Sequence, residues 1–122
     1  MQLRTEMIDG VRVVRPLTLV IDASNSAELG ARLPYELSGT RQMIVDLCCV
    51  REIDGDGLAA ILDCWRAARD RRVRLVLCGL SPRARLVARL LDVESVVVIA
   101  EDLDDALSIF GVTRPAPTER IA

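Results

Sequence analysis

The sequence predicts a single α/β domain: a mixed, mostly parallel central sheet of about five strands with about four helices packed against it. Short apolar runs rich in β-branched residues alternate with stretches whose apolar residues recur at helical spacing. Repeated strand–helix–strand units produce parallel strand pairs. The 122 residues, 51% of them hydrophobic, suffice for one core. We expect the domain to span residues 1–112, with a mobile tail at 113–122 that contains two prolines and no core pattern.

The first predicted elements are two short strands, Leu3 to Ile8 and Val11 to Leu19. Asp9-Gly10 joins them and is typical of a hairpin turn. Proline cannot donate to a sheet ladder, so a bend at Pro16 is expected, with the strand continuing toward Ile21.

A helix is predicted from about Asn25, because the residues before it favour helix caps. Asp22 or Ser24 is expected to accept the first free N–H groups. Pro34 lacks an N–H and crowds the carbonyl four residues back, which predicts a kink or break. Two leucines beside it are still expected to face the core: Leu33 and Leu37.

The centre of the chain combines a strand, a tight turn and a helix. The apolar run Met43–Val50 predicts a buried strand. The turn Asp54-Gly55-Asp56-Gly57 follows, and apolar residues then recur at helical spacing from Leu58 to Trp65. The start of a helix offers free N–H groups and a partial positive charge. This junction is therefore the candidate binding or regulatory site.

Two further strand–helix units complete the predicted fold. Val73–Leu80 is expected to be a strand covered on both faces, and Ser81-Pro82 to start a helix. Ser95–Ala100 is the last predicted strand, followed by a helix that Glu101-Asp102 opens and Gly111 ends. The buried stripe expected on the helix after Ser81 consists of Leu86, Val87, Leu90 and Leu91.

Composition narrows the possible chemistry. The chain has no histidine and no lysine, which removes the commonest general base. Its cysteines lie in apolar segments without C-x-x-C spacing, so buried free thiols are expected rather than a disulfide or zinc framework: Cys48, Cys49, Cys64 and Cys78. No cofactor or metal is predicted. No apolar run is long enough to span a membrane and no signal pattern is present, so a cytoplasmic protein is expected.

Charge is unevenly distributed although the net charge is only −2. An arginine-rich middle, residues 66–89, precedes an acidic stretch, residues 92–105. One interpretation is solvated helix faces with ion pairs, and the other is a charged face that steers a protein partner. Aromatic residues are too few to stack bases, which argues against nucleic-acid binding.

The central stretch resembles the STAS domain, the fold of anti-sigma factor antagonists. The family pattern runs V-D-L-x-x-V and then I/L-D-S-S-G-L. The matching residues are Val45-Asp46-Leu47, Val50, Ile53-Asp54 and Gly57-Leu58. The resemblance covers Leu3 to Phe110, although Leu19 stands where the family has a glycine. It implies a partner-binding loop made of Asp22, Asp54, Gly55, Asp56, Gly57 and Leu58.

In the STAS family a partner kinase phosphorylates the second serine, at the start of the helix. Gly55 and Asp56 replace the two serines here. The resemblance therefore makes Asp56 the equivalent of the phosphorylation site, and a serine/threonine kinase cannot phosphorylate it. It is a partial and permanent phosphoserine mimic. The residues leave two outcomes open: a state that no longer binds an anti-sigma kinase, or constitutive binding to an adapted partner.

The acidic turn allows two other interpretations. Asp54 can cap the helix, with Asp56 stabilised in its first turn. Calcium is the second: the acidic residues fall at EF-hand positions, although the first position holds Glu, the twelfth holds Asp, and a strand precedes the loop. The residues concerned are Glu52, Asp54, Asp56, Gly57 and Asp63.

The leading functional hypothesis is a non-catalytic interaction module that resembles an anti-sigma factor antagonist. Its expected partner is an anti-sigma factor or a serine-kinase-like protein, without nucleic acid or membrane insertion, and a homodimer remains open. The alternative is a STAS subunit of a stress-signalling scaffold or a lipid-transport complex. A small α/β enzyme that uses Asp54 or Asp56 as acid or nucleophile is the rival from another class.

Overall fold

The computed structural model describes residues 1–114, so most of the predicted mobile tail, 113–122, lies outside the described residues. The elements, with η for 3₁₀ helices, are β1 (Leu3–Ile8), β2 (Val11–Pro16), β3 (Val20–Ile21), α1 (Ser26–Arg32), η1 (Leu33–Leu37), β4 (Gln42–Asp46), β5 (Glu52–Ile53), α2 (Gly55–Asp70), β6 (Arg74–Cys78), α3 (Pro82–Leu90), η2 (Val93–Ser95), β7 (Val98–Ala100) and α4 (Leu103–Ile109).

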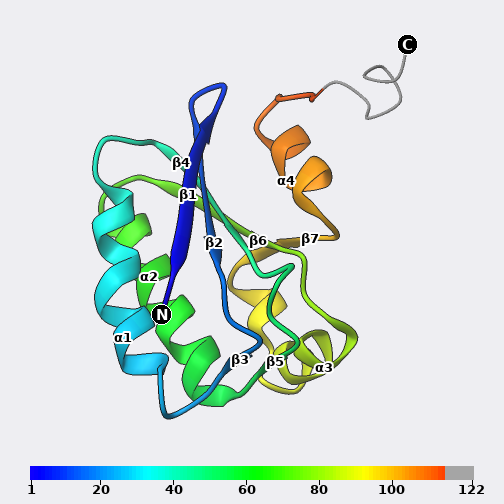
Figure 1. Cartoon of the computed structure of the whole chain (residues 1–122). Helices are drawn as coiled ribbons and strands as arrows, with labels where there is room; N and C mark the ends of the chain where they lie inside the picture. Colours follow the sequence, from blue (N-terminus) through cyan, green and yellow to red (C-terminus); the bar gives the residue numbers. More distant parts are fainter. Residues whose placement is uncertain (115–122) are drawn as a thin grey trace.

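The main sheet has five strands in the order β1-β2-β4-β6-β7, and only the β1–β2 pair is antiparallel. This confirms the predicted mixed, mostly parallel sheet. Helices α1 and α2 lie on one side of the sheet and α4 on the other (Figure 1). A second, two-stranded sheet pairs β3 with β5 beside α3, and the sequence did not predict it.

The β1–β2 hairpin turns at Asp9-Gly10, as predicted. Both residues have positive φ, 46° for Asp9 and 82° for Gly10. Two positive φ angles define the turn whose twist matches the flanking strands, and Asp-Gly is a favoured pair for it. The strands then pair without interruption from Ile8↔Val11 to Leu3↔Pro16.

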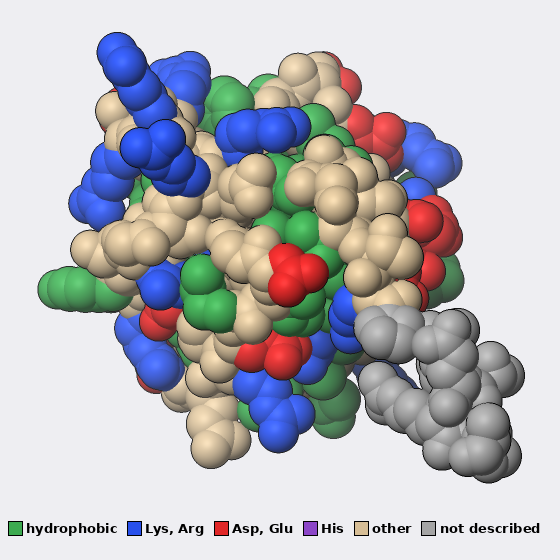
Figure 2. Space-filling view, turned by 90° about the horizontal axis from the view of Figure 1, so that it is seen from above, with side chains coloured by type: hydrophobic (Ala, Val, Ile, Leu, Met, Phe, Trp, Pro, Cys, Tyr) green, Lys and Arg blue, Asp and Glu red, His purple; other side chains and the backbone are tan. Residues whose placement is uncertain are grey.

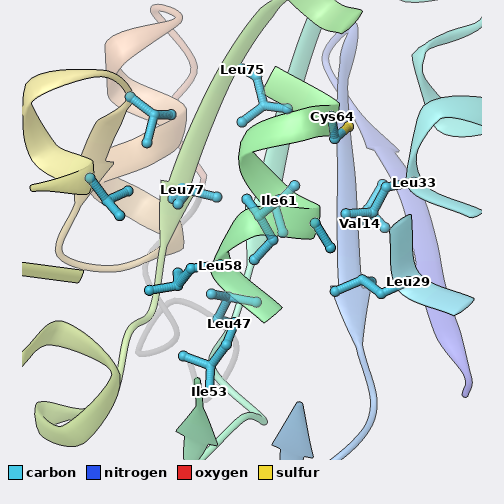
Figure 3. Packing of buried hydrophobic residues seen from close by; sticks show 14 of the residues in the cluster. Val14, Leu29, Leu33, Leu47, Ile53, Leu58, Ile61, Cys64, Leu75 and Leu77 are labelled. Carbon is cyan, nitrogen blue, oxygen red and sulfur yellow. The ribbon is translucent and has the colours of Figure 1, made fainter. Parts of the chain in front are cut away.

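The larger core cluster lies between the sheet and helices α1 and α2 (Figure 3). Leu58 and Ile61 of α2 point toward Leu47 and Leu77, and α1 contributes Leu29. These five side chains are fully buried. At roughly 1.5–3 kcal/mol for each fully buried aliphatic side chain, α2 is held to the sheet mainly by this contact.

The first helix breaks where the sequence predicted. Helix α1 ends at Arg32 and Pro34 lies in η1, with both neighbouring leucines buried. The predicted cap was wrong: Asn25 is the N-cap and its side chain makes no capping bond. The Asp22 carboxylate instead accepts bonds from the backbone N–H and the hydroxyl of Ser24, 2.9 and 2.6 Å long. This local turn competes with capping.

Four predicted strands are shorter in the structure; one of them, β6, spans Arg74–Cys78 instead of Val73–Leu80. β2 ends at Pro16, and the residues expected to continue it form β3 in the second sheet. β4 ends at Asp46 because its carboxylate Oδ1 accepts the N–H of Cys48, 3.1 Å away, which turns the chain. The last strand starts only at Val98, since Val93–Ser95 is 3₁₀-helical.

The prediction of four buried thiols was wrong for half of them. All four cysteines are free, but Cys48 is exposed and Cys49 is half-buried, whereas Cys64 and Cys78 are buried. The reason is the early end of β4, which places the two adjacent cysteines in a loop.

The predicted buried stripe of α3 was wrong for three of its four residues; only Val87 packs, partly buried, against the core. Ala84 and Ala88 are its buried residues, while Leu86, Leu90 and Leu91 are 53%, 76% and 52% exposed. Alanines four residues apart let the helix backbone approach its neighbours closely, so the larger side chains on its flanks turn outward. The helix therefore carries apolar surface into solvent.

Ion pairs account for part of the charge pattern. The paired residues of the arginine-rich middle include Arg66 with Asp63 and Arg85 with Glu101, at 2.7 and 3.0 Å. On the face shown in Figure 2, acidic and basic side chains are interspersed with apolar ones. This arrangement supports the ion-pair interpretation.

Candidate functional site

The acidic turn starts α2, as predicted, but the strand before it is β5 of the second sheet and not the end of the central strand. The Asp54 backbone N–H donates to the Ile21 carbonyl, 3.2 Å away, and this bond extends the β3–β5 pair. Asp54 has an extended backbone and is the N-cap of α2; its Oδ1 accepts the Gly57 N–H at 3.0 Å. The capping interpretation is thus confirmed, and it fixes the direction in which α2 leaves the strand.

Gly57 is required by close packing. A Cβ atom there would lie 2.6 Å from Cγ1 of Ile53 and 2.7 Å from Cγ2 of Ile21. Both Gly57 and Leu58 are buried. These two residues shape the turn from within and present no surface to another molecule.

Gly55 and Asp56 form the exposed tip of the turn. Asp56 lies in the first turn of the 16-residue helix α2, where the N-terminal partial charge stabilises a carboxylate by roughly 0.3–1 kcal/mol. It forms no ion pair with another described residue. Its charge therefore faces solvent.

An apolar groove of about 470 Å³ opens beside this tip, between the β3–β5 pair and α3. Its walls include Val20, Ile53, Leu86 and Val87. Its polar lining residues are Asp22, Glu52, Asp54 and Arg83. The structure thus brings together Asp22, Asp54 and Gly55 of the predicted loop at one groove.

The carboxylate of Asp22 is held in place by its own turn. The hydrogen bonds from the hydroxyl and then the N–H of Ser24 lower the pKa of Asp22. Hydrogen bonds to the charged form favour ionisation, so this residue carries a fixed negative charge.

Two contacts tie α3 to the groove. The Ser81 hydroxyl donates to the Arg51 carbonyl at 2.6 Å and accepts the Ala84 N–H at 3.1 Å, so it both caps α3 and anchors it. Arg83 forms an ion pair with Glu52 of β5. The far wall of the groove is therefore fixed relative to the turn.

The exposed leucines of α3 extend the apolar surface. Leu91 Cδ1 would lie 3.7 Å from a Cβ atom at Gly55, which places this leucine beside the turn. Sequence reasoning missed this surface because it assigned Leu86, Leu90 and Leu91 to the core. The available signal was the pair of alanines, Ala84 and Ala88, which marks a closer packing face than the leucines do.

A largely buried ion pair joins two interior strands of the main sheet, β2 and β4. Nε and Nη2 of Arg15 donate to Oδ2 of Asp46 at 3.1 and 2.9 Å, and Asp46 is only 2% exposed. Hydrogen bonding and charge attraction to Asp46 outweigh burial, so the pKa of Arg15 is raised. The pair lines a second hollow with Cys48 and Gly79, away from the acidic turn.

The site combines acidic side chains with apolar surface. The calcium interpretation requires Asp63, but this residue lies on α2 and pairs with Arg66. Among residues 1–114, no group of three or more His, Cys, Asp or Glu side chains is arranged to hold a metal ion. No helix in the same part of the chain is long and apolar enough to cross a membrane.

The fold and the site define a small α/β module with a strand–turn–helix tip and a neighbouring apolar groove. A family model, the STAS domain, matches residues 2–106. The chain therefore belongs to the STAS domain family. No curated protein matches the sequence.

Solved structures share this fold at low sequence identity. An anti-sigma factor antagonist from Mycobacterium paratuberculosis is 20% identical, with a TM-score of 0.75 over 88% of this chain and 92% of that one. A STAS domain protein from Planctomyces limnophilus is 16% identical, with a TM-score of 0.78 over 89% and 97%. The phosphorylated form of SpoIIAA from Bacillus is 17% identical, with a TM-score of 0.64 over 89% and 99%.

Proposed function

We propose that this protein is a non-catalytic interaction module that acts as an anti-sigma factor antagonist. It binds an anti-sigma factor or a serine-kinase-like protein and so regulates transcription. The observation that carries this proposal is the exposed Asp56 carboxylate at the tip of the turn, beside an open apolar groove. Exposed apolar surface next to fixed charge is characteristic of protein-recognition sites. Membership of the STAS family supports it.

The binding surface combines the turn, the groove and the outer side of α3. Leu86, Leu90 and Leu91 supply apolar contact area. The carboxylate of Asp22, held by Ser24, and the exposed carboxylate of Asp56 give one side of this surface negative charge. The matching partner is therefore a protein segment with apolar side chains next to an arginine or lysine.

Asp56 acts as a permanent, partial substitute for phosphoserine. A phosphoserine brings about −1.5 to −2 charges and three acceptor oxygens, whereas an aspartate brings one charge and two oxygens. We propose that the partner has adapted to this carboxylate and binds constitutively. The exposed leucines of α3 support constitutive binding over a permanently non-binding state. Exposed apolar surface commonly marks a site where another protein binds.

The experiment isolates the partner with the tagged protein and measures its affinity by calorimetry. The variants are Asp56→Ser and Asp56→Ala, with Asp70→Ala at the opposite end of α2 as the matched control. Constitutive binding predicts about tenfold weaker affinity for Asp56→Ala, on the order of 1.4 kcal/mol, and an unchanged value for the control. Unchanged affinity in both Asp56 variants removes the role proposed for this residue.

A second pair of variants tests the α3 surface. Leu90→Ser removes the most exposed leucine of α3, and Tyr35→Ser removes an equally exposed apolar side chain on η1. Weaker binding for Leu90→Ser alone is expected. Isolation of a large scaffold or a transporter subunit, in place of a kinase-like protein, would support the alternative STAS roles.

A further inference from the structure

β1 forms one edge of the main sheet and pairs with β2 alone among the described strands. Its four central residues are exposed, and Met7 is 51% exposed. An edge strand presents unpaired N–H and C=O groups that another strand can bond, and proteins usually protect such edges with proline, bulges or charged side chains. The segment Leu3–Ile8 contains no proline and no bulge, and its two charged residues, Arg4 and Glu6, have opposite signs.

The hairpin determines which backbone groups of β1 face outward. In a two-residue hairpin the residues that flank the turn bond to each other, and bonded pairs then alternate along the strands. The backbone groups of Arg4 and Glu6 therefore bond to β2. The Leu17 N–H donates to the Gln2 carbonyl at 2.8 Å, which is the next bonded pair in the same alternation. The outward groups belong to the remaining positions, Leu3, Thr5 and Met7.

These outward N–H and C=O groups can bond to the same groups of a second copy of β1 that runs antiparallel to the first. With the two-fold axis at Thr5, each Thr5 pairs with its counterpart and each Leu3 pairs with the Met7 of the other copy. All three pairs use outward-facing N–H and C=O groups, so the ladder is complete. Leu3 and Met7 add apolar contact on the side of the sheet that carries α1 and α2.

Charge selects this register over its neighbours. With the axis at Thr5, Arg4 of one copy lies directly opposite Glu6 of the other, which is favourable. Moving the axis to Arg4 or to Glu6 keeps the bonding pattern but places two like charges opposite each other. Only the register centred on Thr5 gives both a full ladder and opposite charges.

The charges on β1 are only partly satisfied within one chain. Neither Arg4 nor Glu6 forms an ion pair with another residue of the described part. Glu6 attracts Arg15 of β2, which is already paired with Asp46. Arg4 lies across from Arg15 and has no carboxylate partner of its own in this part of the chain. Glu6 of a second copy would supply one.

We propose that the protein forms a two-fold homodimer through antiparallel pairing of β1 with β1, centred on Thr5. The two sheets then continue into one. β3, β5 and α3 lie outside this edge, so each copy keeps its groove and acidic turn uncovered. The interface is small, so the dimer is weak and depends on concentration.

Sedimentation equilibrium over a concentration series up to about 1 mM tests the proposal. In the proposed register, position 4 of each copy lies opposite position 6 of the other, so this pair occurs twice in the dimer. Glu6→Arg makes both of these pairs positive–positive, and Arg4→Glu makes both negative–negative. Each variant is expected to raise the dimer Kd about thirtyfold. An equimolar mixture of the two variants restores opposite charges at both positions and should dimerise as the wild type does. Glu94→Arg, an exposed charge reversal on η2, is the matched control and leaves Kd unchanged.

Thr5→Pro provides an independent test. Its N–H points away from β2, so proline in both copies removes the two hydrogen bonds of the Thr5–Thr5 pair, weakens the dimer and leaves the hairpin ladder intact. Circular dichroism checks that each variant is folded. A wild-type protein that stays monomeric throughout the series overturns the proposal, as does an unchanged Kd for Glu6→Arg or failure of the mixture to recover dimer. A dimer lost in Leu90→Ser but kept in Glu6→Arg would assign the interface to α3 and likewise overturn it.

Discussion

Replacing Gly57 by alanine tests how tightly the site is built. The new Cβ atom would lie 2.6 Å from Ile53 Cγ1 and 2.7 Å from Ile21 Cγ2. These distances are about 1 Å inside an ordinary carbon–carbon contact of roughly 3.5–4.0 Å. Since Ile21 and Ile53 are buried and hold the β3–β5 pair, neither has free space into which to move.

The magnitude follows from two opposing effects. Overpacking a buried position costs about 1–3 kcal/mol. Replacing glycine by alanine within a helix stabilises the folded state by about 0.5–1 kcal/mol. The difference spans about 0–2.5 kcal/mol, and because both isoleucines are enclosed we expect Gly57→Ala to lower the free energy of unfolding by about 1–2 kcal/mol.

Gly55→Ala is the matched control, two residues away in the same turn. Its Cβ atom would lie 3.7 Å from Leu91 Cδ1, an ordinary contact, so only the helix-propensity gain remains. Urea denaturation followed by circular dichroism gives both free energies of unfolding, provided the m-values agree. The reasoning fails if Gly57→Ala is as stable as the wild type, or if Gly55→Ala loses as much as Gly57→Ala does.

Three further predictions concern single side chains. Asp54→Ala removes the N-cap of α2 and should cost about 1 kcal/mol of unfolding free energy in urea denaturation, whereas Asp54→Ser, which can still cap, should cost only a few tenths. Asp46→Ala leaves Arg15, 18% exposed, without its carboxylate and should cost about 3 kcal/mol by the same measurement; a loss below about 1 kcal/mol would show that water replaces the pair. Cys48 is exposed as a residue, but partial desolvation of its thiol and then the Asp46 carboxylate raise its pKa from 9.0 to about 11. Iodoacetamide should therefore alkylate it about 100-fold more slowly than an ordinary cysteine at pH 8. The rate, followed by mass spectrometry, should rise about tenfold per pH unit up to about pH 11, and a rate that levels off near pH 9 would contradict this.

Periodicity and local chemistry were sufficient for much of the fold. The Asp9-Gly10 turn, the break at Pro34 and the capped start of α2 each depend on one or two residues whose preferences are strong. Tertiary context rarely overrides such preferences. The order of the five strands of the main sheet and of the four α-helices followed from them, whereas the short strands β3 and β5 did not.

The errors arose where packing or side-chain bonding decides. Asp46 ends β4 early by accepting the Cys48 N–H, a contact that no apolar pattern reveals. On α3, alanine and leucine are both apolar, so periodicity could not tell which face packs; the close approach through Ala84 and Ala88 decided it. The α3 side of the groove could therefore not be predicted from the sequence, whereas the acidic turn could.

The acidic turn separates residues that make the fold from those that face a partner. Asp54, Gly57 and Leu58 are fixed by capping, close packing and burial, whereas Gly55 and Asp56 face solvent. A change at Asp56 should therefore alter recognition while costing the fold little. Asp56→Ser is expected to lower the free energy of unfolding by only about 0.3–1 kcal/mol, the contribution of one carboxylate at a helix start. If urea denaturation instead shows a loss near 3 kcal/mol, Asp56 supports the structure, and its use as a substitute for phosphoserine loses its basis.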